Sequence, residues 1–255
     1  MAKRIFAILC GPSCVGKGPL VAALDRFHPD LDIALIPVVK SRESRVKGPR
    51  PEEGKLWNNP DFFRDEEELL GLAQDPRYLV GDCRGLPQAV DLEKIPNSDS
   101  RHLLVEIHHS IGLELAKTLD LADTECLTLF LSPLGRQEVQ DLKAADVDLC
   151  DYLTQLMLHK QMARARYHGK TVDASFIRDA KKRAGDSLSE LQSASHFSRV
   201  IVNHDGEGHL NWNRLPNGVF QARPEGDAGR ALRCLAGLLA DTEPVGDENW
   251  NDLLL

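Results

Sequence analysis

The feature that most constrains the fold is a glycine-framed turn near the start of the chain. Gly11 to Gly16 stands between an apolar run, Arg4 to Leu9, and a segment with helical spacing, Lys17 to Phe27. In this strand-to-helix setting, a G-x-x-x-x-G-K turn lets the backbone curl so that its N–H groups point inward, and the helix N-terminus adds partial positive charge. The sequence therefore predicts an α/β fold with a loop that binds phosphate groups.

The loop residues expected to hold a triphosphate are consecutive: Gly11, Pro12, Ser13, Cys14, Val15, Gly16, Lys17 and Gly18. Lys17 is the cation expected to reach the outer phosphates and to act in catalysis. Gly18 and Pro19 stand where a hydroxyl group usually contacts Mg²⁺, so metal binding is expected to be weaker or differently arranged. Pro19 fits the first helical turn, where its missing N–H is not needed.

Apolar runs with strand composition alternate with helical segments along the chain. Beyond Arg4 to Leu9, strands are expected at Ile33 to Val39, His102 to Ile107, Leu127 to Leu131 and Arg199 to Val202. Beyond Lys17 to Phe27, helices are expected at Asp65 to Gln74, Ser110 to Leu119, Arg136 to Arg166, Ser175 to Ser193 and Asp227 to Ala240. This alternation predicts a mostly parallel sheet with helices on both faces.

Composition excludes several classes of protein. The 255 residues, 42% of them apolar, suffice for one large core with or without a mobile subdomain. A net charge of −8 argues against a general nucleic-acid binder. No membrane segment is expected, and six scattered cysteines without a C-x-x-C pair suggest neither disulfides nor a zinc site. We therefore expect a cytoplasmic protein, and its oligomeric state is not predicted.

Between Val39 and Arg101 the chain is rich in charge, proline and glycine, as expected of an inserted subdomain or of loops over a cleft. Arg45 and Arg50 either form surface ion pairs with neighbouring glutamates or bind an anion, because a guanidinium fork matches phosphate oxygens. Arg84, in a turn before Gly85, is either an exposed turn residue or a further anion ligand.

Polar residues follow the expected strand at His102 to Ile107. Glu106 is either the acid that orders Mg²⁺ beside a phosphate loop or a simple strand-end carboxylate. His108 and His109 are adjacent, and adjacent strand residues point to opposite faces, which disfavours a shared metal ion. One of the two histidines is instead expected to line an acceptor pocket.

Five segments occur in the order seen in guanylate kinases, and the chain resembles that family over about 200 residues. They are GPSCVGKG at Gly11 to Gly18, SRESRVKGPRPEEG at Ser41 to Gly54, LLVEIHHSIG at Leu103 to Gly112, TLFLSP at Thr128 to Pro133 and RVIVNHD at Arg199 to Asp205. The resemblance implies a P-loop NTPase three-layer α/β sandwich with a parallel sheet, an inserted acceptor-binding subdomain and a helical lid.

The resemblance also implies a division of the chain. A single domain is expected over residues 1–240, with its core in 1–40, 101–135 and 175–240. The acceptor-binding insert is expected at 41–100 and the lid at 136–174. Residues 241–255 are expected to form an acidic tail whose Trp250 docks on the body or on a partner.

In the family, a T-T-R-x-x-R-P-x-E segment binds the acceptor nucleotide. The corresponding candidates here are Ser41, Arg45, Arg50 and Glu53, with two additional residues between the arginines. Trp57 and Arg84 stand where the family has phosphate-binding tyrosines, and His108 stands where an aspartate reads guanine. These departures imply a nucleoside monophosphate or other phosphorylated small molecule, but not GMP, as the acceptor.

The resemblance implies an ATP-dependent phosphotransferase that uses ATP and Mg²⁺. Its lid arginines would be Arg164 or Arg166, with Arg183 as a further catalytic arginine on the next helix; alternatively, the basic cluster from Lys160 to Lys170 is the polar end of a long helix. Gly18 is similar to the G-K-G loop of adenylate kinases, where water mediates most magnesium contacts, and Glu106 would act on the metal through water. The alternative is a catalytically silent guanylate kinase-like module that binds a nucleotide or a protein.

Overall fold

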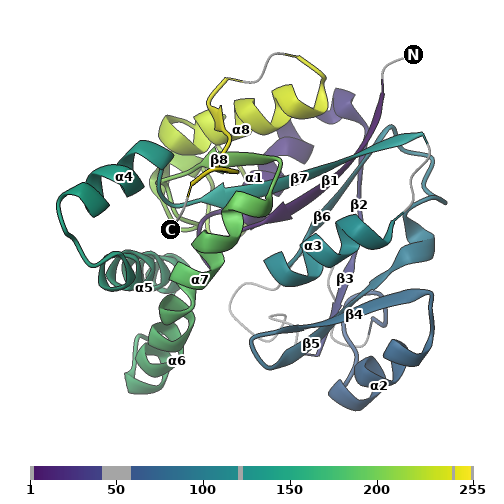
Figure 1. The fold of residues 1–255 in the computed structure, drawn as a ribbon, viewed down its shortest axis with the longest axis horizontal. Coiled ribbons are helices and arrows are strands. Elements are labelled where there is room, and N and C mark those ends of the chain that lie inside the picture. Colours follow the sequence, from purple (N-terminus) through teal and green to yellow (C-terminus); the bar gives the residue numbers. More distant parts are fainter. Residues whose placement is uncertain (1–2, 42–58, 120–122, 243–244, 254–255) are drawn as a thin grey trace. The chain divides into compact units, whose positions relative to one another are not determined.

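The computed structural model describes residues 3–41, 59–119, 123–242 and 245–253 (Figure 1). The chain divides into two compact units. Unit 1 comprises Met1–Leu9 and Leu31–Thr128, and unit 2 comprises Cys10–Asp30 and Leu129–Leu255. The fold is α/β with a mostly parallel main sheet, as the sequence predicted.

The main-sheet strands of unit 1 are β1 (Arg4–Cys10), β2 (Ile33–Leu35) and β6 (His102–Glu106). They pair in parallel in the order β2-β6-β1. The stretch from Phe6 to Leu9 is fully buried, which explains why its sequence is continuously apolar rather than alternating. Helix α3 (His109–Thr118) follows β6. Strand β1 ends at Cys10, directly before the glycine-framed turn.

Unit 1 also contains an antiparallel sheet that the sequence analysis missed. Its strands β3 (Val38–Lys40), β5 (Leu86–Asp91) and β4 (Tyr78–Cys83) pair in that order. The predicted single strand from Ile33 to Val39 was wrong, because Ile36 and Pro37 separate β2 from β3, which belong to different sheets. The β4–β5 turn consists of Arg84 and Gly85, whose φ angles of 58° and 82° are those of a tight hairpin.

Helix α2 (Glu66–Gly71) of unit 1 is shorter than predicted, since it tightens into the 3-10 segment Leu72–Gln74. Asp65 caps it by accepting a hydrogen bond of 2.8 Å from the Glu68 N–H. The other 3-10 segments of the described residues are Pro29–Leu31, Leu92–Lys94, Ser193–His196 and Leu210–Trp212.

In unit 2, β7 (Thr124–Ser132, from Leu129 onward) pairs in parallel with β8 (Arg199–Val202), and β9 (Asp247–Glu248) adds an antiparallel edge. Helices α1 (Lys17–Phe27) and α8 (Gly226–Leu239) contact each other, and α8 also packs on β8. The predicted bounds of α1 and β8 are confirmed.

Two helices that the sequence predicted as continuous are each interrupted. The segment from Arg136 to Arg166 forms α4 (Arg136–Ala144) and α5 (Leu149–Tyr167), and the next segment forms α6 (Ala174–Gly185) and α7 (Ser187–Gln192) (Figure 1). Asp146 has a φ angle of 55°, which a helix cannot accommodate, and Asp148 then caps α5 by accepting from the Asp151 N–H at 3.0 Å.

The C-terminal tail docks on the body of unit 2. Glu248 accepts hydrogen bonds from the Arg136 N–H at 2.8 Å and from the Trp250 indole at 2.6 Å, so it caps α4. The Arg136 guanidinium donates to the Asp252 carboxylate at 2.7 Å. Trp250 is fully buried. The docking confirms the first of the two expectations for this tail.

Replacing Trp250 with alanine should lower the free energy of unfolding by about 3 to 5 kcal/mol, because it empties a fully buried indole site. Urea denaturation measures the loss, and the exposed neighbour Asn251→Ala is the control, expected within about 0.5 kcal/mol of the unmodified chain. Equal stabilities for the two variants would show that the tail adds nothing to the fold.

Among the described residues, no helix combines the length and the apolar character that crossing a bilayer requires.

Candidate functional site

The glycine-framed turn adopts a curled backbone that only small residues permit. Gly11 and Gly16 have φ angles of 139° and 107°, and the Cys14 residue between them has a φ of 70°. A Cβ atom on Gly11 would lie 2.3 Å from the Leu131 carbonyl oxygen, and one on Gly16 would lie 2.7 Å from the Asn203 amide nitrogen. Both glycines are therefore required by sterics as well as by conformation.

Lys17 begins α1 and spans the mouth of this loop. Its ammonium group donates to the carbonyl oxygens of Gly11 at 2.7 Å and Pro12 at 3.0 Å. The N-terminus of α1 adds its partial positive charge at the same place. A Cβ on Gly18 would meet no atom within 4 Å, so space alone does not require glycine there. The lysine and the helix N-terminus together bring positive charge to the loop, which suits an anion.

A second loop, the brace loop (Asn203 to Trp212), supports the first. The fully buried Asn203 side chain donates to the Val15 carbonyl at 2.7 Å, and the Glu207 N–H donates to the Cys14 carbonyl at 2.9 Å. The Trp212 indole donates to the Gly206 carbonyl at 3.1 Å. No part in the site was predicted for this loop, because nothing in the sequence shows its contact with a loop about 190 residues earlier.

Two cations on one face of α5 reach the brace loop. Lys160, only 6% exposed, donates to the carbonyl oxygen of His204, and burial lowers the pKa of this lysine to about 8. One turn later, the Arg164 guanidinium lies 2.8 Å from the Glu207 carboxylate. Burial alone would lower the pKa of Arg164, but Glu207 outweighs it and raises the pKa above its ordinary value. Arg164 therefore stays charged inside the fold.

The lowered pKa of Lys160 predicts a pH-dependent stability. Between pH 8 and the unfolded value of 10.5, the unfolded chain binds a proton that the folded chain has lost, so raising the pH favours the folded state. We expect the free energy of unfolding to rise by about 2 to 3 kcal/mol across this window, and the rise to be missing in Lys160→Met. Urea denaturation at pH 8 and pH 10 measures both; parallel curves for the two proteins would contradict the assignment.

Arg183, the further predicted catalytic arginine, lies on α6. Burial raises the pKa of the Cys14 thiol, while the charges of Arg164 and Arg183 act on it in the opposite direction. Arg183 also pairs with Asp179. Arg166, by contrast, is exposed on another face of α5, because two helical positions differ by about 200°. Arg166 therefore does not share the face of α5 that carries Lys160 and Arg164.

A pocket in unit 2 is lined by His204, the residue after Asn203. Its lining also includes Gly135, Glu138, Asp227, Cys234 and Glu248. The His204 ring lies between two carboxylates, with Nδ1 2.6 Å from Asp227 and Nε2 2.7 Å from Glu138. Because carboxylate and carbonyl oxygens accept hydrogen bonds, the pocket suits a ligand that presents N–H groups.

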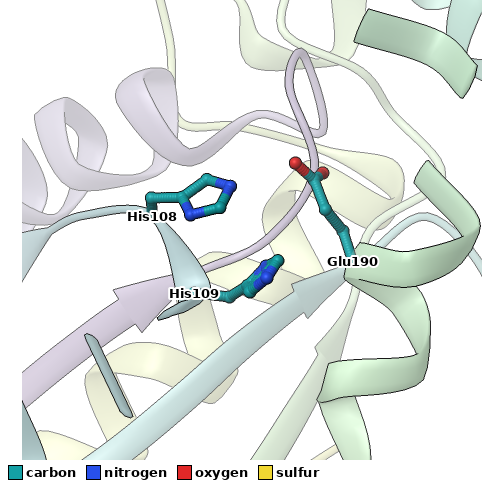
Figure 2. Close-up of side chains that lie close together, drawn as sticks. All are labelled: His108, His109 and Glu190. Carbon is teal, nitrogen blue, oxygen red and sulfur yellow. The ribbon is translucent and has the colours of Figure 1, made fainter. Parts of the chain in front are cut away.

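Five candidate residues of unit 1 lie within the described residues. Glu106 ends β6 as an exposed residue and is the register partner of Leu9 in β1. His108 and His109 stand at the start of α3 (Figure 2). Ser41 follows β3, and Arg84 lies in the β4–β5 turn that the sequence predicted. Arg45, Arg50, Glu53 and Trp57 lie outside the described residues.

The expectation that His108 and His109 point to opposite faces was wrong. The strand ends at Glu106, so His108 is the residue before α3 and His109 its first residue. Their rings lie side by side (Figure 2), with centroids 4.2 Å apart. The His108 Nδ1 lies 2.9 Å from the Ser110 hydroxyl. The turn from strand to helix places consecutive side chains side by side.

Known proteins that are similar to this chain in sequence or structure include guanylate kinases. No family model matches the chain. It is 27% identical over 210 residues to the guanylate kinase of Synechococcus sp. (strain JA-3-3Ab), covering 80% of this chain and 78% of the relative. It is 25% identical over 208 residues to that of Synechococcus sp. (strain CC9311), covering 80% and 88%. The crystal structure of guanylate kinase from Anaplasma phagocytophilum shares the fold, with a TM-score of 0.51 and 14% identity over 96% of this chain and 89% of that one.

The chain is similar to guanylate kinases at low sequence identity. The brace loop is hydrogen-bonded to the loop from Gly11 to Lys17, and the docked tail caps α4.

Proposed function

We propose that the chain is an ATP-dependent phosphotransferase that transfers the γ-phosphoryl group to a phosphorylated small molecule. The observation that carries the proposal is the loop of unit 2, where Lys17 donates to two loop carbonyls at 2.7 and 3.0 Å beneath a helix N-terminus. Such a loop suits a polyphosphate. The names of the sequence relatives support a kinase in general terms.

In this proposal the protein acts mainly by positioning and charge neutralisation, since phosphoryl transfer needs no protein nucleophile. The loop N–H groups and Lys17 would hold the β- and γ-phosphates. Arg164 and Arg183, whose charges both act on the Cys14 thiol, would neutralise the charge that develops on the transferring group. Lid movement would then exclude water, so that ATP is not hydrolysed.

The pocket that begins at His204 is proposed for the base of ATP. Its carboxylates at Glu138 and Asp227 can accept hydrogen bonds from an exocyclic amino group. We expect His204→Ala to raise the KM for ATP by about tenfold with little change in kcat, because its ring holds both carboxylates in place for a base contact that is made equally in the ground state and the transition state. Steady-state kinetics with ATP as the varied substrate measures this, and an unchanged KM would exclude the pocket.

Mg²⁺ would enter with ATP as part of the substrate. The residue after Lys17 is glycine, so the chain does not supply the usual hydroxyl ligand at this point of α1. The residues therefore fit a metal held by phosphate oxygens and water, with Glu106 as the candidate acid acting through water.

For the acceptor we propose a nucleoside monophosphate other than GMP, or another small phosphorylated molecule. His108 replaces the aspartate expected to read guanine, and Arg84 replaces a phosphate-binding tyrosine. Ser41, Arg45, Arg50, Glu53 and Trp57 complete the proposed acceptor residues, within the insert at 41–100.

A catalytically silent nucleotide-binding module is the second candidate, and the Gly18-Pro19 pair after Lys17 is the observation that favours it. ADP release measured with a panel of nucleoside monophosphates and sugar phosphates separates the two. Acceptor-stimulated release that Lys17→Ala abolishes supports the kinase. ATP binding without stimulation by any acceptor supports the silent module.

A further inference from the structure

Glu207 contacts both the loop from Gly11 to Lys17 and helix α5. Its N–H donates to the Cys14 carbonyl at 2.9 Å. Glycines flank it on both sides: a Cβ on Gly206 would lie 3.1 Å from the Cys14 oxygen, and one on Gly208 would lie 2.9 Å from the Arg164 Cα. The backbone at Glu207 is therefore packed between the loop and the helix, and its position is fixed by both.

The Glu207 side chain extends to α5. Its Oε2 atom lies 2.8 Å from Nη1 of Arg164, and the two side chains are 21% and 14% exposed. One turn earlier, Lys160 donates to the His204 carbonyl, so α5 joins the brace loop at two points. A largely buried ion pair of this kind holds its geometry better than an exposed one.

We propose that Glu207 is a positioning residue for Arg164, holding its guanidinium group beside the phosphate loop for phosphoryl transfer. The proposal rests on the proposed kinase function. Arginine has many rotatable bonds, and a fixed carboxylate selects one arrangement of them. A guanidinium carries five N–H donors, so the bond to Glu207 leaves others able to reach phosphate oxygens.

Kinetics of a double-mutant cycle tests the coupling. Glu207→Gln keeps the shape of the side chain and should lower kcat about tenfold or more, while the KM for ATP stays within about threefold. Arg164→Ala should lose at least as much, and the double variant should be no slower than Arg164→Ala alone, because both changes remove one function. Glu207→Asp should recover part of the rate. The control, Glu114→Gln, removes one exposed carboxylate from α3 and should retain full activity.

A kcat for Glu207→Gln within about twofold of the unmodified chain would overturn the proposal, as would losses that multiply in the double variant. A crystal structure of Glu207→Gln with tripolyphosphate provides a readout that does not depend on turnover. An Arg164 side chain that leaves its position there supports the placement by Glu207, and an unmoved Arg164 contradicts it. If the unmodified chain releases no ADP with any acceptor, the kinase proposal fails, while the crystal structure still decides whether Glu207 places Arg164.

Discussion

Lys17→Ala is expected to lower the rate of acceptor-stimulated ADP release by about a thousandfold or more, since it removes the cation nearest the transferring group. The loss should appear in kcat as well as in ATP affinity. The fold should be retained, because Lys17 is only half-buried and forms two side-chain hydrogen bonds within the loop itself.

The matched control for Lys17→Ala is Lys117→Ala, which removes one exposed lysine from α3. Its ADP release should equal that of the unmodified chain. Comparable rates for the Lys17 variant and this control would exclude Lys17 from phosphoryl transfer. Circular dichroism of both variants establishes that each remains folded.

Gly16→Ala should have the second large effect, because it deforms the loop itself. The φ angle of 107° disfavours any L side chain, and the added methyl group would lie 2.7 Å from the Asn203 amide and 2.9 Å from the Trp212 ring. Both neighbours are buried and fixed by hydrogen bonds. We expect the free energy of unfolding to fall by about 2 to 4 kcal/mol and ATP affinity to fall at least about a hundredfold.

Gly18→Ala is the control for this second variant, because a Cβ at Gly18 meets nothing within 4 Å. Its stability should equal or slightly exceed that of the unmodified chain, since alanine favours the first turn of α1 more than glycine does. Urea denaturation and calorimetric titration with ATP compare the pair. Equal stability losses at both positions would show that the close contacts around Gly16 carry no cost.

The sequence predicted local structure well where one element is both apolar and regular. The buried run from Phe6 to Leu9 and the helix that begins at Lys17 are short-range patterns, and their strand and helix were predicted correctly. The order of five motifs predicted the fold class. These signals lie within a few neighbouring residues, so one sequence is enough to read them.

Other parts of the fold depend on contacts between distant segments. The β4–β5 hairpin turns at Arg84 and Gly85, but its short strands mix polar with apolar residues and carry no clear alternation. The break between α4 and α5 depends on Asp146 adopting a positive φ angle, which aspartate permits but does not require. Neither feature is marked strongly in the sequence.

The candidate site divides in the same way. Lys17 and its glycines were predicted from their spacing between an expected strand and an expected helix, and Arg164 and Arg183 from resemblance. Glu207 and Asn203 were not predicted as part of the site, because their importance comes from hydrogen bonds to Cys14 and Val15 in a segment about 190 residues away. The sequence signal for this loop is weak: an asparagine directly after a strand, followed by glycines at alternate positions.

The central claim is that the loop from Gly11 to Lys17 wraps its N–H groups around a triphosphate. A crystal structure of the chain with a non-hydrolysable ATP analogue at millimolar concentration tests it most directly. We predict the β- and γ-phosphates within hydrogen-bonding distance of the loop N–H groups and of the Lys17 ammonium group. A triphosphate bound elsewhere, or no bound nucleotide at that concentration, would contradict the account.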